Sequence, residues 1–223
     1  MLLAIIVATT YFARPLAHMV QPIVAENWTE YRQGEAFPDG HVFGPWTARF
    51  NGLGKVSIVT DPLLGAALQL APKAAASPSE THAALVTSRR SFGDFNATVT
   101  VLTTQQLRSP DPNAWEVAWV LWHYTDNQHF YYFILNRNGW ELGKEDATTA
   151  SGRRAFITGS YPLLALGKPN TIDISQNGTT ISLKIDSKPI IQYADDEQPY
   201  LSGEVGLYSE DSDVRFGRIV IRP

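Results

Sequence analysis

The segment that decides the fold is residues 117–145, which read VAWVLWHYTDNQHFYYFILNRNGWELGKE. Aromatic and branched aliphatic residues fill three runs of this segment, a composition typical of β-strands. Turn-forming residues separate the runs at Thr125–Gln128 and at Asn138-Gly139, and the Asn-Gly dipeptide is a strong hairpin signal. We therefore predict three antiparallel strands joined by two short turns.

These two turns set a register between the three strands. A four-residue first turn and a two-residue second turn fix which residues lie opposite one another. The predicted pairs are Tyr124 with His129, Trp122 with Tyr131, Val120 with Phe133, Leu135 with Leu142, and Phe133 with Lys144. Successive side chains along each strand then point to opposite faces of the sheet.

One face of this sheet is assigned to the core of the protein. Its side chains are apolar or aromatic, and such groups gain free energy on leaving water. Its members are Ala118, Val120, Trp122, Tyr131, Phe133, Leu135 and Leu142. Among them we expect Trp122, Phe133 and Leu142 to be almost fully buried.

The opposite face mixes aromatic rings with polar groups. Its members are Val117, Trp119, Leu121, His123, Phe130, Tyr132 and Ile134, with Asn136, Glu141 and Glu145 beside them. Flat rings cover the apolar faces of a pyranose, and polar tips bond its hydroxyls. The candidate carbohydrate-binding residues are Trp119, His123, Tyr132, Glu141 and Glu145. The alternative is that a loop or a partner covers this face.

Short strand-like runs continue through the rest of the chain after Ala25, and no stretch there has a convincing helical period. The expected strands are Trp46–Phe50, Lys55–Thr60, Ala67–Leu70, Ala83–Thr87, Phe95–Leu102, Glu116–Tyr124, His129–Leu135, Trp140–Glu145, Ala155–Thr158, Thr171–Gln176, Thr180–Ile185, Pro189–Tyr193, Glu204–Tyr208 and Val214–Ile221. The Pro- and Gly-rich segment Gly34–Pro45 predicts irregular surface chain. Residues 26–223 are therefore expected to form one all-β domain.

A further hairpin is expected at Asn177-Gly178. A two-residue turn there pairs Ile174 with Ile181 and Ile172 with Leu183, which places the aliphatic side chains on one face. The predicted architecture is a two-sheet antiparallel β-sandwich of the jelly-roll type.

Several motifs of the chain resemble the concanavalin A-like lectin/glucanase superfamily, in particular its laminin-G-like domains and 3-keto-disaccharide hydrolase-like jelly rolls. They are Phe92–Phe95, Trp119–Asp126, Tyr131–Phe133, Gly139–Lys144, Thr171–Asp186, Val205–Tyr208 and Val214–Phe216. The resemblance covers roughly residues 46–221 and implies an antiparallel jelly roll, often with glycan contact on its concave sheet. It does not carry a reaction with it.

No residue pattern singles out a catalytic centre. The Glu-x-Asp-x-x-Glu pattern of glucanases in that superfamily is absent. Glu141 and Glu145 lie four residues apart, about 13 Å along an extended strand, whereas paired catalytic carboxylates need about 5–9.5 Å. A lyase reading would combine His123 and Tyr132 with Arg89 or Arg90, although no spacing favours it. Binding without catalysis is the expectation that we prefer.

One acidic turn is a candidate cation site. In Glu210–Asp213, the carboxylates of Asp211 and Asp213 could supply oxygen ligands to a structural Ca²⁺. The alternative is a solvated turn that needs no metal. His123 and His129 point to opposite faces in the predicted register, which argues against a shared zinc, and we expect no other cofactor.

Composition narrows the possible partners. The chain carries 18 Lys and Arg against 22 Asp and Glu, a net charge of −4, so nothing draws it to nucleic acid. It contains no Cys, which excludes disulfides and thiolate metal sites.

Residues 1–25 form a separate hydrophobic segment. Its apolar members include Leu2, Leu3, Ile5, Ile6, Val7, Tyr11 and Phe12, with Arg14 at the polar boundary. The first apolar run is shorter than the roughly 20 residues of a membrane span. The segment is therefore interpreted as a membrane anchor, a docking segment for a protein assembly, or a signal peptide.

Three functions follow from these observations. The preferred one is a non-catalytic extracytoplasmic sandwich, held by its N-terminal segment to a membrane or larger protein assembly as an accessory subunit. The second is a carbohydrate-binding module, secreted if the N-terminus is cleaved. The third is a polysaccharide-cleaving hydrolase or lyase.

Overall fold

The computed structural model describes residues 23–77 and 79–223. Within these ranges all regular structure is β-strand, as predicted, and no helix there is long and apolar enough to span a membrane. The strands are β1 (Val24–Glu26), β2 (Val42–Phe43), β3 (Trp46–Phe50), β4 (Lys55–Asp61), β5 (Gly65–Ala71), β6 (Ala83–Phe92), β7 (Phe95–Gln106), β8 (Ala118–Asp126), β9 (His129–Asn136), β10 (Gly139–Asp146), β11 (Arg153–Gly159), β12 (Asn170–Asn177), β13 (Thr180–Ile185), β14 (Lys188–Ala194), β15 (Gly203–Glu210) and β16 (Ser212–Arg222). The predicted anchoring residues from Leu2 to Arg14 lie outside the described residues.

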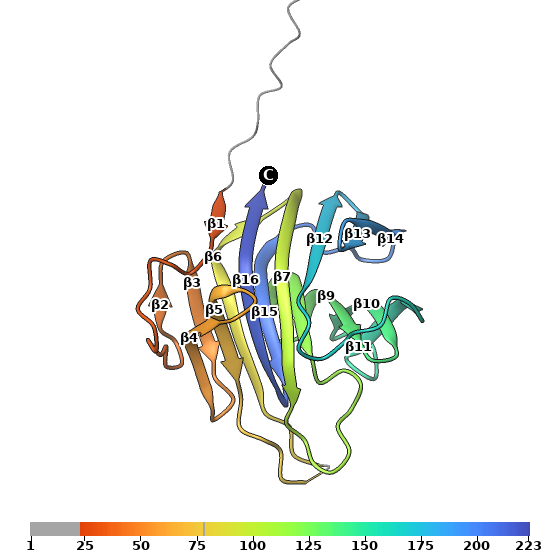
Figure 1. Cartoon of the computed structure of the whole chain (residues 1–223). Coiled ribbons are helices and arrows are strands. Elements are labelled where there is room, and N and C mark those ends of the chain that lie inside the picture. Colours follow the sequence, from red (N-terminus) through yellow and green to blue (C-terminus); the bar gives the residue numbers. More distant parts are fainter. Residues whose placement is uncertain (1–22, 78) are drawn as a thin grey trace, which may run out of the picture.

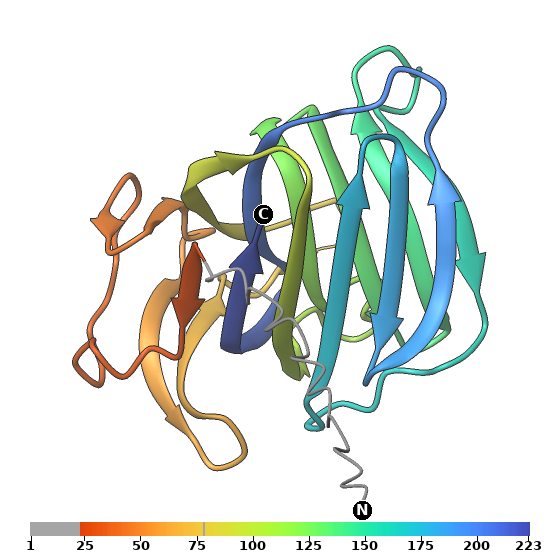
Figure 2. The same cartoon turned by 90° about the horizontal axis from the view of Figure 1, so that it is seen from above.

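The strands form two antiparallel sheets packed face to face, which confirms the predicted sandwich. Sheet A has the order β14-β13-β12-β7-β16-β5-β4, with β1 also paired to β16. Sheet B has the order β11-β10-β9-β8-β15-β6-β3-β2. In Figures 1 and 2, strands β2–β4 lie at one end of the sandwich and β12–β14 at the other.

The core lies between the two sheets and contains the predicted side chains. The exposed fractions of Trp122, Phe133 and Leu142 are 0%, 1% and 0%, which confirms their predicted burial. The indole Nε1 of Trp122 donates a hydrogen bond of 2.6 Å to Oε1 of Gln176, on β12 of sheet A. This bond joins the two layers across the core near the end of β12.

The predicted turn positions of two hairpins are wrong, although the faces are right. In the β12–β13 hairpin Asn177 pairs with Thr180, so Ile174 lies opposite Leu183 rather than Ile181. In the β9–β10 hairpin Gly139 pairs with Asn136, so Phe133 lies opposite Leu142. Each register differs from the predicted one by two residues, and a shift of two leaves every side chain on its predicted face.

The predicted register between β8 and β9 is correct only in part. Trp122 lies opposite Tyr131 and Val120 opposite Phe133, as predicted, but the register shifts between Trp122 and Asp126. His123 has a φ of 49° there, a left-handed conformation that interrupts the alternation of side chains. The predicted pair of Tyr124 with His129 is consequently absent, and Asp126 lies opposite His129.

The N-terminal entry is more ordered than predicted. Strand β1 runs beside the C-terminal strand, with Val24 opposite Ile221. Trp28 follows it and is fully buried, and its Nε1 donates a 2.6 Å hydrogen bond to the carbonyl of Gly217. The segment expected to be irregular contains the short strand β2 and the buried side chain of Phe37.

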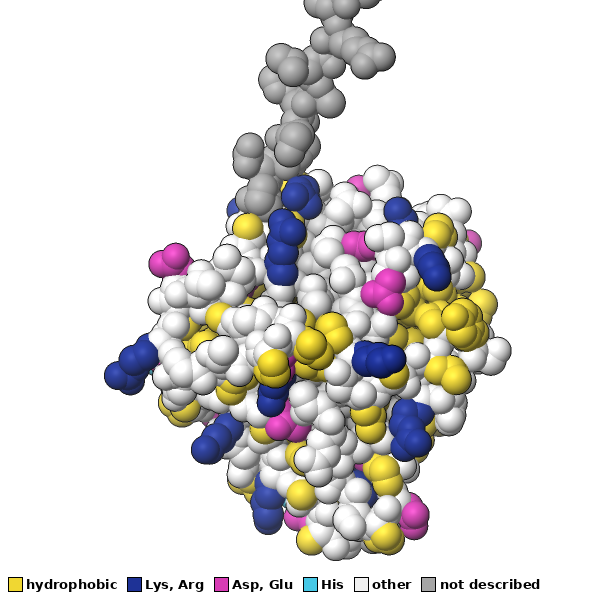
Figure 3. All heavy atoms as spheres, in the orientation of Figure 1, with side chains coloured by type: hydrophobic (Ala, Val, Ile, Leu, Met, Phe, Trp, Pro, Cys, Tyr) yellow, Lys and Arg dark blue, Asp and Glu magenta, His cyan; other side chains and the backbone are white. Residues whose placement is uncertain are grey.

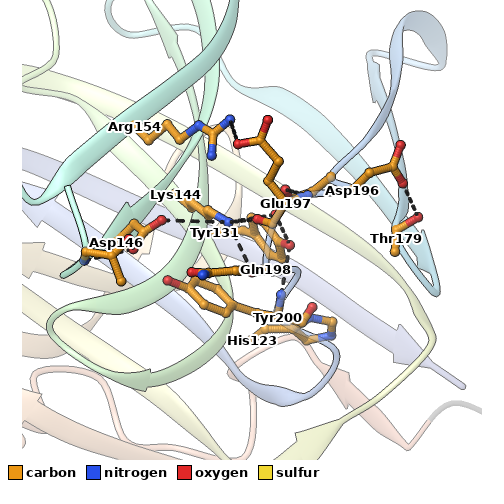
Figure 4. A network of polar contacts seen from close by, with 12 residues as sticks. His123, Tyr131, Lys144, Asp146, Arg154, Thr179, Asp196, Glu197, Gln198 and Tyr200 are labelled. Carbon is orange, nitrogen blue, oxygen red and sulfur yellow. Dashed lines mark hydrogen bonds and ion pairs between the residues drawn. The ribbon is translucent and has the colours of Figure 1, made fainter.

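A buried polar network closes one end of the sandwich (Figure 4). Nζ of Lys144, on β10, lies 3.0 Å from Oδ2 of Asp195 and donates to the carbonyls of Glu197 and Gln198, at 2.8 and 3.1 Å. The hydroxyl of Tyr131 donates to the same Asp195 oxygen at 2.6 Å. These contacts fasten the loop after β14 to sheet B. Because the groups in the network already hydrogen-bond to one another, we do not assign a ligand to it.

Candidate functional site

The face of sheet B that points away from the core carries most of the predicted site residues. On this outer face, Ile134 of β9 lies between Trp119 of β8 and Glu141 of β10. Tyr132 lies two residues before Ile134 on β9 and therefore on the same face. Glu145 lies further along β10, also on this face. The structure thus brings Trp119, Tyr132, Glu141 and Glu145 together on one surface.

Arg153 of β11 lies across the middle of this face. Its Nη2 donates to Oε1 of Glu141 at 2.7 Å, and its Nε donates to the Tyr132 hydroxyl at 2.9 Å. The Tyr132 hydroxyl in turn donates to Oε1 of Glu141 at 2.6 Å. The guanidinium carbon lies 5.0 and 4.7 Å from the ring centroids of Trp119 and Tyr132, a cation–π arrangement.

This arginine changes what the face can offer to a ligand. Trp119 and Tyr132 are only 4% and 0% exposed, so neither ring is a free stacking platform. The alternative expectation from the sequence is that this face is covered. For these two rings that alternative is correct. The cover includes this chain's own Arg153 and Tyr208, whose ring centroid lies 5.3 Å from that of Trp119.

Strand β15 adds a further acid to the face. The hydroxyl of Tyr208 donates to Oε1 of Glu210 at 3.2 Å. Burial raises the pKa of the Glu210 carboxyl, and burial, together with the charge of Glu210, raises that of Glu145. Two partly desolvated carboxyls thus lie near Arg153, and only Glu145 had been predicted.

His123 does not join the outer face, so its predicted placement is wrong. The side chain is 1% exposed, and its ring centroid lies 5.7 Å from that of the core residue Phe95. Its Nδ1 and Nε2 lie 2.7 and 3.0 Å from the carbonyl oxygens of Tyr200 and Gly93. The positive φ at the bulge turns the imidazole inward, away from any position that a sugar could reach.

The outer face is hollowed into a cleft of about 570 Å³ where β9 and β11 end and β10 begins. Such a volume lies in the range of about 300–1,000 Å³ typical of ligand sites. Its lining residues are Ala114, Trp115, Ile134, Asn136, Asn138, Trp140, Glu141, Arg153, Thr158, Gly159 and Ser160. We call this hollow the main cleft.

Trp115 is the accessible aromatic ring of the main cleft. It is 41% exposed, and its carbonyl accepts a 2.7 Å hydrogen bond from Nε1 of Trp119, which fixes the loop before β8 to the face. Trp140 also lines the cleft and packs directly on Gly159, where a Cβ would collide with the indole. The cleft therefore combines indole rings with amide, hydroxyl and charged groups.

The two predicted calcium ligands do not converge. Oδ2 of Asp211 accepts a 2.7 Å bond from Nη2 of Arg108, and this carboxylate is fully buried. The carboxylate of Asp213 instead accepts from Nε2 of Gln69. Among the described residues no group of three or more His, Cys, Asp or Glu side chains could hold a metal ion.

Charge is spread evenly over the side of the molecule seen in Figure 3. Lys and Arg side chains are scattered over this side, some of them adjacent near its upper edge, with Asp and Glu between them. Hydrophobic side chains gather near β13 and β14 on this side, where Pro189 and Ile190 line a shallow apolar hollow.

Comparison with known proteins identifies the fold. No protein-family model matches the chain, and no curated protein matches its sequence. The carbohydrate binding module CBM66 from Bacillus subtilis superposes with a TM-score of 0.58 at 12% identity, over 83% of this chain and 100% of that one. A glycoside hydrolase family 16 endo-glucanase from Bacteroides ovatus gives 0.57 at 10% identity, over 82% and 98%.

A third solved structure has a similar fold. The carbohydrate recognition domain of Emp47p gives a TM-score of 0.50 at 10% identity, over 84% of this chain and 94% of that one. The chain therefore has the jelly-roll fold of concanavalin A-like lectins and glucanases, as its motifs had implied.

Proposed function

We propose that this domain binds a glycan in the main cleft and does not cleave it. The observation that carries the proposal is the half-exposed ring of Trp115 beside polar groups of Asn136, Asn138 and Thr158 in one cleft. An aromatic ring covers the apolar face of a sugar, and amides and hydroxyls exchange hydrogen bonds with its hydroxyls. Similarity of fold to carbohydrate-binding proteins supports this choice.

The acids near the cleft favour binding over hydrolysis. Glu141 accepts hydrogen bonds from both Tyr132 and Arg153 through the same oxygen, Oε1, which orients the carboxylate and pairs its charge. A general acid must instead carry a proton toward the glycosidic oxygen. In this role Glu141 holds Arg153 in place rather than reacting.

We extend the proposal to the position of the domain in the cell. The apolar residues that precede the sandwich would hold it outside the cytoplasm, at a membrane or in a protein assembly, unless they are removed on secretion. Support for this part is the composition of residues 1–25 alone.

The test is calorimetric titration of the full chain with a panel of neutral oligosaccharides, followed by Trp115→Ala. We expect at least one oligosaccharide to bind, and Trp115→Ala to weaken it at least tenfold. The matched control is Leu53→Ala, which removes an exposed apolar side chain (75% exposed) outside the cleft. Absence of binding across the panel, or equal affinity of the two variants, would reject the main cleft as the site.

A further inference from the structure

A second hollow lies on the outer face of sheet B, beyond the cluster formed by Arg153, Trp119 and Tyr132. Its volume is about 370 Å³, again within the range of small-molecule sites. Four aromatic rings contribute to its lining: Phe50, Tyr124, Phe130 and Tyr208. A single acidic side chain, that of Glu145, completes the lining beside aliphatic residues and Asn127. We call it the aromatic hollow.

Glu145 is placed there by the β9–β10 register. It lies directly opposite Phe130, so the carboxyl group stands beside an aromatic ring of the hollow. Among the hydrogen bonds and ion pairs between described residues, none reaches the Glu145 side-chain oxygens. The Glu145 side chain is half-buried, so a cationic donor that entered the hollow would meet a carboxylate free of competing protein donors among the described residues.

The arginines of the outer face form their ion pairs with other acids, although the charge of Arg153 still acts to lower the pKa of Glu145. Nη2 of Arg49 lies 2.6 Å from Oε2 of Glu204, and Nη2 of Arg153 lies 2.7 Å from Oε1 of Glu141. Arg49 is thus paired with Glu204, and Arg153 with Glu141. Glu145 and Glu210 remain as acids for which the described residues supply no ion-pair partner within 4.0 Å. The resulting negative potential attracts cations and repels anions.

We infer that the aromatic hollow binds an organic ammonium group, and that the glycan of this face therefore carries an amino sugar. The inference rests on the proposed function, because the main cleft and the aromatic hollow share one face. Rings attract an ammonium through their negative π-faces, and the Glu145 carboxylate supplies the matching charge and hydrogen-bond acceptor. Polyanionic glycans such as uronate chains are disfavoured by the same charges.

The experiment compares two oligomers of equal length, one of glucosamine and one of glucose, at a pH where the amine is protonated. Calorimetric titration of the full chain should show at least tenfold tighter binding of the glucosamine oligomer. Glu145→Gln should remove that advantage, so that the variant binds the two oligomers with equal affinity. Glu30→Gln, an exposed site outside both hollows, makes the same change in net charge and should alter neither affinity.

A competition arm isolates the ammonium group. Tetramethylammonium chloride should weaken binding of the glucosamine oligomer more than sodium chloride at equal ionic strength. Equal binding of the two oligomers, a preference that survives Glu145→Gln, or equal effects of the two salts would overturn the ammonium inference while leaving glycan binding intact. Failure of both oligomers and of the neutral panel would reject the proposed function as well.

Discussion

Nζ of Lys144 and Oδ2 of Asp195 lie 3.0 Å apart, and their side chains are 0% and 1% exposed. The lysine reaches from β10 of sheet B, and the aspartate directly follows β14 of sheet A. The pair is therefore a contact between the layers rather than within one of them. The ring of Tyr200, 5.1 Å from the ammonium, covers it.

Lys144→Met should destabilise the domain by about 3–5 kcal/mol, because it leaves the Asp195 carboxylate buried without its cation. Urea unfolding followed by circular dichroism measures this free energy. The double variant Lys144→Met/Asp195→Asn should recover part of the loss, since the buried charge is then gone. A cost below about 1 kcal/mol for the single variant, as for an exposed ion pair, would contradict the buried placement.

Trp122→Ala should cost about 3–5 kcal/mol, because it opens a cavity in the core and breaks the bond to Gln176. Trp115→Ala serves as the matched control, since its ring is largely outside the core. That variant should stay within about 0.5 kcal/mol of the parent protein. Chemical denaturation of both gives the comparison, and similar losses would refute the assignment of the two rings to core and surface.

Acid should destabilise the protein partly through His123. Burial of the imidazole lowers its pKa below the unfolded value of about 6.5. Above that value the ring is neutral in both states. As the pH falls through it, the unfolded chain takes up a proton first, so stability is lost. Between pH 7.5 and 5.5, the midpoint temperature of the parent protein should fall more than that of His123→Gln.

A fall in the midpoint temperature of the parent protein that is no larger than that of His123→Gln would also be informative. Both ring nitrogens of His123 face backbone carbonyls, which accept only from N–H groups and act to raise the pKa. If the two proteins lose the same midpoint temperature on acidification, these carbonyls offset the effect of burial on the pKa, and if the parent protein loses less, they outweigh it.

Arg153→Ala should uncover the ring of Trp119. Removal of the guanidinium that lies over the indole admits water, so quenching of tryptophan fluorescence by acrylamide should increase. Arg154→Ala is the control, because that neighbouring arginine pairs with Glu197 and its guanidinium lies over Phe156 instead. Equal quenching of the two variants would mean that Arg153 does not shield Trp119.

The sequence predicted which face of the sheet a side chain occupies better than it predicted which residues lie opposite one another. Alternation of side chains depends only on whether a residue number is odd or even, so Phe133 and Ile174 are buried as expected although both hairpin registers are off by two. An Asn-Gly pair marks a turn without saying which residues close it. Alternation failed at His123, because a bulge depends on contacts with β15 that local sequence does not encode.

The candidate site was only partly predictable for a similar reason. Trp119, Tyr132 and Glu141 come from three strands that follow one another, and their common face can be deduced from local pairing. Arg153 and Glu210 come from β11 and β15, whose positions beside β10 and β8 follow from the topology of sheet B. No spacing in the sequence brings an arginine at 153 over a tryptophan at 119.

The pairing of β1 with β16 determines how the domain bears a mechanical load. A pull on the chain ahead of Val24 acts first on the β1–β16 ladder and then on Trp28, four residues further on. To unravel further, the pull must extract a fully buried indole, so the force is resisted close to its point of entry. The resisting strand belongs to sheet A, whereas both hollows open on sheet B. A domain tethered by its N-terminal side would thus bear a load first on sheet A, in the layer opposite its binding surface.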